Sequence, residues 1–153
     1  MNKPKLLSIS KENVTYGENV TLIEPQNLYG CDLRDNVFVG PFVEIQSEVI
    51  VGECTKIQSH SFICSKVSIG KNCFIGHGVT FINDTFSSGS PAGGDKSLWR
   101  KTSISDSVFI GSNSTILPVK ICSDVVTLIS NNTFFYRFHT KISLDSVKSC
   151  IIF

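Results

Sequence analysis

The chain has 153 residues, of which 41% are hydrophobic and only 18% are charged, against a usual ~25% charged. This length corresponds to one domain, and the composition predicts a packed core rather than a disordered chain. Fourteen Lys and Arg against thirteen Asp and Glu leave a net charge of +1. No bulk field therefore favours nucleic acid or an anionic membrane surface, and we expect no nucleic-acid partner.

No apolar run approaches the ~20 residues that a membrane-spanning helix needs, and the first residues do not resemble a secretory signal. The cysteines show no CxxC spacing and no clustering; they are Cys31, Cys54, Cys64, Cys73, Cys122 and Cys150. We therefore expect a cytoplasmic chain without a membrane span, in which the cysteines are small buried thiols.

A repeat of six residues follows a lead-in of residues 1–15 and occupies residues 16–126. From Leu33 onward, every sixth residue is large and apolar: Leu33, Val39, Ile45, Val51, Ile57, Ile63, Ile69, Ile75 and Phe81. The residue four places after each is small or β-branched: Val37, Val43, Val49, Thr55, Ser61, Val67, Cys73, Val79 and Thr85. Neither the helix period of 3.6 nor the strand period of 2 gives two such columns. Each hexad therefore reads as a short strand followed by a corner.

The corners are marked by residues that tolerate a left-handed backbone. Glycine follows the large residue at Gly40, Gly52, Gly70 and Gly76, and asparagine stands nearby at Asn36 and Asn72. Three hexads would close one triangular coil of eighteen residues, and coils would stack at the ~4.8 Å spacing of paired strands. Towards the N-terminus the apolar column continues at Tyr16, Leu22 and Leu28, with a five-residue step to Leu33.

The repeat is interrupted once, between Phe81 and Ile104. The hexad expected at position 87 is missing, and the pattern resumes at Ile104, Ile110 and Ile116, so seventeen residues are inserted between coils. The insertion includes the Gly-, Ser- and Pro-rich segment 87–94, which cannot form a strand. We expect an extended loop over about residues 84–103, with Trp99 near its return as an anchor or as a wall for a ligand.

Polar residues capable of chemistry fall at the corners. A coil offset of eighteen places His60 beside His77 on the adjacent coil, roughly 5 Å away along the axis. Asn83 and Asp84 stand at the next corner, just before the inserted loop. Asn and Asp are ordinary turn residues, so a purely structural role is the alternative for each.

Both columns disappear after Ile121. Counting by six gives Thr127, Thr133, His139 and Asp145, none of them apolar, while residues 133–145 alternate with period two. We expect residues 127–153 to form an atypical tail, with a strand that caps the last coil or joins a partner. The other interpretation is that the tail is out-of-frame sequence on a truncated, impaired chain.

Three segments carry a family resemblance: 28–31 (Leu-Tyr-Gly-Cys), 40–46 (Gly-Pro-Phe-Val-Glu-Ile-Gln) and 76–84 (Gly-His-Gly-Val-Thr-Phe-Ile-Asn-Asp). With the hexads, the chain resembles the left-handed parallel β-helix acyltransferases, an all-β class. The segments resemble, within that class, the N-acetyltransferases that act on nucleotide-linked amino sugars. The resemblance implies transfer of an acetyl group from acetyl-CoA to an amino group of a UDP- or dTDP-linked sugar for surface polysaccharides.

The resemblance also implies a homotrimer with its site between two subunits. Asn83 would hold the amine, His77 would act as base or polar wall, and Asp84 would orient the amine or a sugar hydroxyl. The expected substrate contacts are His60, Trp99, Lys96, Arg100 and Lys101. The expected acetyl-CoA contacts are Gly111, Ser112 and Pro118.

Two alternatives remain for the function. One is a hexapeptide O-acyltransferase with a different acceptor, and the other is a non-catalytic trimeric scaffold. We expect no metal, because only two histidines lie in the coils, whereas a γ-type carbonic anhydrase needs three on its zinc.

Overall fold

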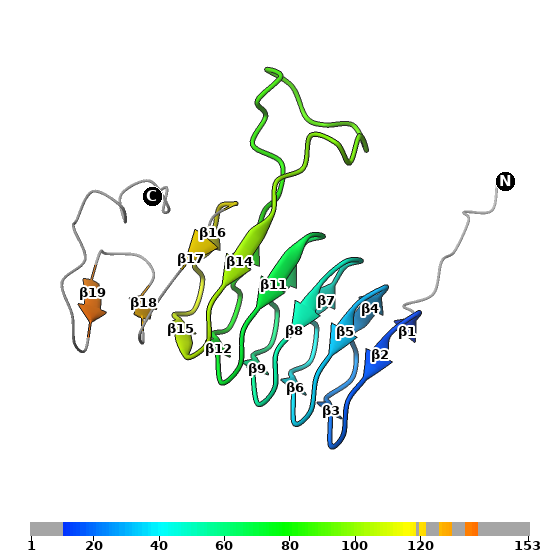
Figure 1. The fold of residues 1–153 in the computed structure, drawn as a ribbon, viewed down its shortest axis with the longest axis vertical. Helices are drawn as coiled ribbons and strands as arrows, with labels where there is room; N and C mark the ends of the chain where they lie inside the picture. The colour runs from blue at the N-terminus through cyan, green and yellow to red at the C-terminus, as the bar shows by residue number, and fades with distance from the viewer. Residues whose placement is uncertain (1–10, 119, 122–125, 130–133, 138–153) are drawn as a thin grey trace, which may run out of the picture.

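The chain folds into a three-sided prism of short parallel strands (Figure 1). The computed structural model describes residues 11–118, together with the backbone of 120–121, 126–129 and 134–137. These residues contain β-strands and no α-helix. The expected all-β parallel β-helix with one extended loop is confirmed.

The strands form three sheets, which the chain visits in turn. Sheet A contains β1 (Lys11–Glu12), β4 (Asn27–Tyr29), β7 (Glu44–Ile45), β10 (Phe62–Ile63), β13 (Thr80–Phe81) and β16 (Thr115–Ile116). Sheet B contains β2 (Thr15–Tyr16), β5 (Asp32–Leu33), β8 (Ile50–Val51), β11 (Val67–Ile69), β14 (Thr102–Ile104) and β17 (Lys120–Ile121). Sheet C contains β3 (Thr21–Leu22), β6 (Phe38–Val39), β9 (Lys56–Ile57), β12 (Phe74–Ile75), β15 (Val108–Ile110), β18 (Val126–Ile129) and β19 (Phe134–Arg137). One strand from each sheet makes one coil.

The strand register follows the spacing of the sequence repeat. Val39 pairs with Ile57 and Ile57 with Ile75, each eighteen residues apart. Leu28 pairs with Ile45, seventeen residues apart, because of the five-residue step before Leu33. Across the loop, Ile75 pairs with Ile110, thirty-five residues apart. The sequence separation between paired residues therefore grows by the predicted insertion, while the coils on both sides remain stacked.

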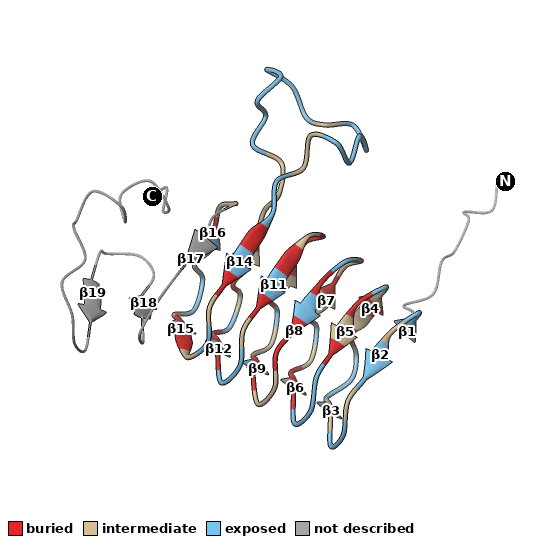
Figure 2. Ribbon diagram, viewed as in Figure 1, coloured by how far each residue is buried: buried red, intermediate tan, exposed pale blue. Residues whose placement is uncertain are grey.

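The two predicted columns form the core, and Figure 2 shows the buried residues recurring along the strands. All nine large residues from Leu33 to Phe81 are buried, as are their small companions from Val37 to Val79. The last companion, Thr85, is exposed, so that prediction was wrong; the chain has already left the prism for the loop. At the N-terminal end Leu28 is buried, but Tyr16 is 44% exposed, because few coils cover it there.

Most corners have a left-handed residue three places after the large apolar one. Asn36 (φ 58°) and Asn72 (φ 53°) confirm the predicted role of asparagine. The predicted left-handed role of the glycines at 40, 52, 70 and 76 is wrong, since none of them has a positive φ. Glycine is needed at these positions because the coils pack closely there: a Cβ at each would lie within 3.0 Å of an atom of the adjacent coil.

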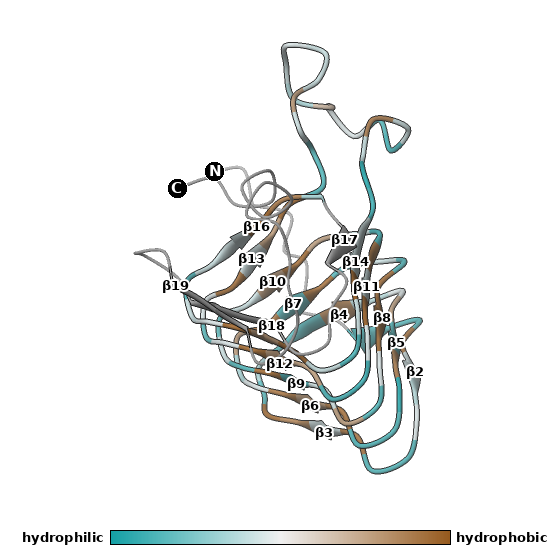
Figure 3. Cartoon of the chain, turned by 60° about the vertical axis from the view of Figure 1, so that its left-hand side comes forward, coloured by the Kyte–Doolittle hydropathy of each residue, from teal (hydrophilic) through white to brown (hydrophobic). Residues whose placement is uncertain are grey.

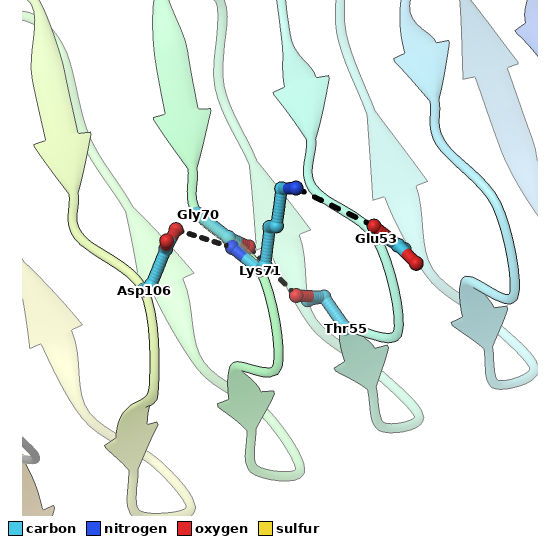
Figure 4. Close-up of polar contacts among 5 residues, drawn as sticks. All are labelled: Glu53, Thr55, Gly70, Lys71 and Asp106. Carbon is cyan, nitrogen blue, oxygen red and sulfur yellow. Dashed lines mark hydrogen bonds and ion pairs between the residues drawn. The ribbon is translucent and has the colours of Figure 1, made fainter.

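Gly70 shows this crowding most clearly (Figure 4). A Cβ on Gly70 would lie 2.4 Å from Asp106 Oδ1, which accepts a 2.7 Å hydrogen bond from the Lys71 backbone N–H. On the preceding coil, Thr55 Oγ1 donates a 2.8 Å hydrogen bond to the Gly70 carbonyl. The glycine therefore lets the carboxylate of one coil reach the backbone of the coil before it.

The cysteines fit the expectation of buried free thiols where they are described. Cys31, Cys64 and Cys73 are buried and Cys54 is partly buried, all four without a disulfide. Burial raises the pKa of the Cys31 thiol to about 11 and that of Cys64 to about 12, so both remain protonated at neutral pH. Cys122 and Cys150 lie outside the described residues.

The pairing extends beyond the predicted ends of the repeat. Strand pairing begins at Lys11, which pairs with Leu28, inside the segment expected as a lead-in. At the other end Leu128 pairs with Ile110, so counting by six to Thr127 misses the register by one residue. Strand β19 then pairs antiparallel with β18. The rest of the expected tail strand, up to residue 145, lies outside the described residues.

Among the described residues, no helix is long and apolar enough to cross a membrane. In the same part of the chain, no group of three or more His, Cys, Asp or Glu side chains could hold a metal ion.

Gly70→Ala should lower the free energy of unfolding by about 1–3 kcal/mol, the usual cost of overpacking, because the new methyl group would press against Asp106. Chemical denaturation would measure this change. Ser68→Ala is the control, since Ser68 is exposed on the same strand. A loss no larger than that of the control would contradict the account of the glycines.

Candidate functional site

The two coil histidines lie on the edge between sheets C and A. His77 follows β12 and His60 follows β9, and both side chains are exposed. His60 occupies the left-handed corner position with φ 63°, whereas His77 precedes Gly78, which takes that position on the next coil. The edge geometry thus directs both imidazoles away from the core.

A serine on each neighbouring coil contacts His77. Ser59 Oγ lies 2.8 Å from His77 Nδ1 in a hydrogen bond, and the His77 backbone N–H donates a 3.1 Å bond to Ser112 Oγ. When Nδ1 carries the proton, its N–H donates the hydrogen bond to Ser59 Oγ and Nε2 keeps its lone pair. That tautomer is the one a general base requires.

Asn83 lies at the next edge, between sheets A and B, at the base of the loop. Its side-chain nitrogen donates a 3.1 Å hydrogen bond to the Ser65 carbonyl, and its backbone carbonyl accepts a 2.8 Å bond from the Arg100 backbone N–H. No described residue donates a hydrogen bond to its Oδ1. The amide is therefore fixed through its nitrogen, with an acceptor oxygen left over.

Asp84 is engaged with the loop backbone. One carboxylate oxygen accepts a 2.9 Å hydrogen bond from the Phe86 N–H, and the other accepts a 2.7 Å bond from the Ala92 N–H. The carboxylate therefore joins the outgoing and returning parts of the loop. Its expected contact with the amine or with a sugar hydroxyl stays a prediction.

The returning part of the loop carries the basic residues and the tryptophan. Lys66 Nζ donates a 2.6 Å hydrogen bond to the Lys96 carbonyl, and Lys96 Nζ lies 5.9 Å from the centre of the half-buried Trp99 ring. Arg100 and Lys101 are exposed. The Lys96 ammonium and the Trp99 ring therefore make a cation–π contact within the loop, and the expected role of Trp99 as an anchor or as a wall for a ligand stays a prediction.

A polar network beside Asn83 was not predicted from the sequence. Glu44 Oε1 accepts hydrogen bonds from Tyr29 Oη (3.2 Å) and Gln46 Nε2 (3.0 Å), and Gln46 Oε1 accepts one from the Ser65 backbone N–H (3.2 Å). Burial, and then the Glu44 carboxylate, raise the pKa of Tyr29. The network leads through Ser65 to Asn83. Pairs such as Gln46 and Ser65 could have been found by searching for polar residues about one coil apart.

The predicted site residues divide between two edges of the prism. Gly111 and Ser112 follow β15 on the edge of His77, whereas the register of β13 with β16 places Pro118 on the edge of Asn83. Along one chain, six residues separate His77 from Asn83, which is roughly 15–20 Å of strand. Figure 3 shows the loop rising from the edge between sheets A and B, away from the edge between sheets C and A. One chain alone does not bring His77 and Asn83 together.

The family model described as "Hexapeptide repeat of succinyl-transferase" matches residues 66–82 and 101–134. These are the coils before and after the loop, and the unmatched gap between them is the loop itself. The matched residues show that the chain contains hexapeptide repeats of this kind. Such repeats account for the six-residue columns and for the stacked coils.

Two curated relatives of this hexapeptide-repeat protein are considerably longer. The bifunctional protein GlmU of Zymomonas mobilis is 33% identical over 118 residues, which are 71% of this chain and 26% of that protein. GlmU of Limosilactobacillus fermentum is 37% identical over 95 residues, 61% of this chain and 18% of that protein. The chain thus spans about a quarter or less of their length.

A solved structure shares the fold. The acetyltransferase domain of PglB from Neisseria gonorrhoeae superposes with a TM-score of 0.52 at 16% sequence identity. The match covers 75% of this chain and 51% of that chain. At this identity, the likeness concerns the fold alone.

Asp84→Ala should loosen the loop, because Phe86 and Ala92 would both lose a charged hydrogen-bond acceptor. Trypsin should then cleave after Lys96, Arg100 and Lys101 about ten-fold faster or more, as followed by mass spectrometry. Asp95→Ala is the control, since the Asp95 side chain accepts hydrogen bonds only from Ser97 within the loop. Equal cleavage rates in the two variants would contradict the bracing role of Asp84.

Proposed function

We propose that this protein transfers an acetyl group from acetyl-CoA to the amino group of a UDP- or dTDP-linked amino sugar. Support comes from the hexapeptide-repeat family, whose model is described by a succinyl-transferase, and from the segment 76–84, which resembles nucleotide-amino-sugar N-acetyltransferases. Surface-polysaccharide synthesis in the cytoplasm is the setting that this reaction suggests.

The hydrogen bonding of the Asn83 side-chain amide is the observation that supports the proposal most. The Ser65 carbonyl fixes the amide nitrogen, so the Oδ1 atom has a set direction at the base of the loop. A carboxamide oxygen accepts a hydrogen bond from a neutral amine and leaves the nitrogen lone pair free to attack. Holding the amine in this way supplies the orientation that the bimolecular reaction otherwise lacks.

His77 is the group proposed to receive the proton. As the sugar amine attacks the thioester carbonyl, a C–N bond forms and the nitrogen gains positive charge. Nε2 of His77 takes one proton from that nitrogen, and collapse of the intermediate breaks the C–S bond and releases CoA, whose thiolate is protonated in turn. A base positioned in this way contributes typically about 10²–10⁴-fold to the rate.

Acetyl-CoA would be held beside His77. Gly111 and Ser112 lie on the coil after His77, on the same edge, and Ser112 already contacts the His77 backbone. A backbone N–H at such a corner can stabilise the negative charge that develops on the thioester oxygen. The acetyl group would then lie where the imidazole can reach the attacking amine.

The separation of the two edges supports a site shared between subunits. In the proposed homotrimer, the His77 edge of one subunit faces the Asn83 edge and loop of its neighbour. A cyclic trimer provides three such contacts, each made of two different edges. This arrangement also gives a use to the loop, which projects beyond the prism of its own chain (Figure 1).

A panel of UDP- and dTDP-linked amino sugars, with simple alcohols and serine as alternative acceptors, tests the proposal by release of CoA. We expect turnover with an amino sugar and not with alcohols. Turnover only with alcohols or serine would indicate an O-acyltransferase. If no acceptor reacts and calorimetry shows no heat at high micromolar acetyl-CoA, the non-catalytic scaffold replaces the proposal.

With a confirmed substrate, His77→Ala should lower kcat about 10²–10⁴-fold and Asn83→Ala should lower kcat/KM about 10–100-fold. Ser59→Ala should give a smaller loss, because it frees the imidazole to rotate and to change tautomer. Asn72→Gly is the control, since Gly tolerates the positive φ of that distant corner. Full activity of both His77→Ala and Asn83→Ala would exclude this site.

A further inference from the structure

The edge between sheets C and A carries aromatic rings on successive coils. Its left-handed corner position is filled in turn by Phe42, His60, Gly78 and Asn113. At the edge between sheets B and C, the same position holds Asn19, Asn36, Cys54, Asn72 and Ser107. Asparagine tolerates this backbone better than a bulky aromatic residue does. Phe42 therefore occupies a position where asparagine would suit the backbone better.

The two rings contact each other at the surface. Their centroids lie 4.9 Å apart with an angle of 32° between the ring planes. Phe42 is 59% exposed, more than any other large hydrophobic side chain in the described part of the chain, and His60 is exposed as well. Leaving this apolar area in water gives the isolated chain no stability. The pair thus has no role in the core of this chain.

The position of the pair relates it to the candidate site. Ser59, which bonds to His77 Nδ1, directly precedes His60. On the next coil the corner residue is Gly78, which has no side chain to cover the His60 ring. The Asn113 side-chain oxygen lies over Gly78, 2.5 Å from where a Cβ would stand. Aromatic faces, an imidazole and a carboxamide are therefore gathered along one edge.

We propose that Phe42 and His60 form a stacking platform for a nucleobase. The proposal rests on the proposed function, in which both reactants contain such a base: uracil or thymine in the nucleotide sugar, and adenine in the coenzyme. Stacking suits an exposed aromatic pair because every base offers a flat π-face. The Asn113 carboxamide, with both donor and acceptor groups, suits the polar edge of a base.

The repeat itself supplies variants that keep the backbone. Asn fills the same corner position at Asn36 and Asn72, so Phe42→Asn and His60→Asn remove a ring from a corner that the fold builds elsewhere with Asn. Phe42→Tyr keeps the stacking face. Cys54→Asn is the matched control, because it makes the same kind of change on the edge between sheets B and C.

Calorimetric titration with UMP, dTMP and adenosine 3′,5′-bisphosphate tests the platform on the full chain. We expect Phe42→Asn and His60→Asn to weaken binding of one of these nucleotides about ten- to hundred-fold, with Phe42→Tyr and Cys54→Asn unchanged. Weakening of UMP or dTMP assigns the platform to the nucleotide sugar, and weakening of the bisphosphate assigns it to the coenzyme. The corresponding KM should rise more than kcat falls.

Three results would overturn the platform. One is wild-type affinity for all three nucleotides in both Asn variants. Another is the absence of binding of any of them by the wild type. The third is dissociation of the oligomer in Phe42→Asn but not in Cys54→Asn, which would show that the rings hold two copies together. An inactive wild type that binds a nucleotide through Phe42 would refute the proposed function and leave the platform standing.

Discussion

Burial of two side-chain columns, six residues apart in the sequence, is the constraint on which the structure depends. The large column from Leu33 to Phe81 and its small companions fill the axis of the prism, and each coil covers the one before it. Apolar burial is the main favourable term in such a stack. It fixes the register so firmly that the loop can be inserted between β13 and β14 without disturbing the ladders on either side.

The same constraint determines where polar and aromatic groups can be displayed. Inward positions are taken by the columns, so the edges and the outer faces remain. At most corners the chain takes a left-handed residue, and close packing of the coils brings residues about eighteen apart into contact. Ser59 with His77 and Phe42 with His60 are two products of this stacking. In this way a regular solenoid sets exposed side chains at fixed spacings.

The sequence predicted those features that burial alone decides. The coil of eighteen residues, the core columns and the position of the insertion all follow from apolar spacing. Prediction from the sequence failed where the role of a residue depends on close packing between coils and not on burial. Gly70 is an example, because its role is set by a carboxylate on the next coil. Prediction also failed at Leu128, where an irregular step hides the register. The partners of Asn83 and Asp84 could not be predicted, because the loop has no periodicity from which contacts could be inferred.

The proposed activity depends on a separation that is visible in the single chain: His77 and Asn83 lie on different edges, so each would complete a neighbour's site. Mixing equal amounts of the two impaired variants, His77→Ala and Asn83→Ala, under conditions that exchange subunits tests this directly. After random exchange the whole population should show about a quarter of wild-type activity, because one interface in four then pairs an intact His77 with an intact Asn83. No recovery, with subunit exchange demonstrated, would contradict a site shared between two subunits.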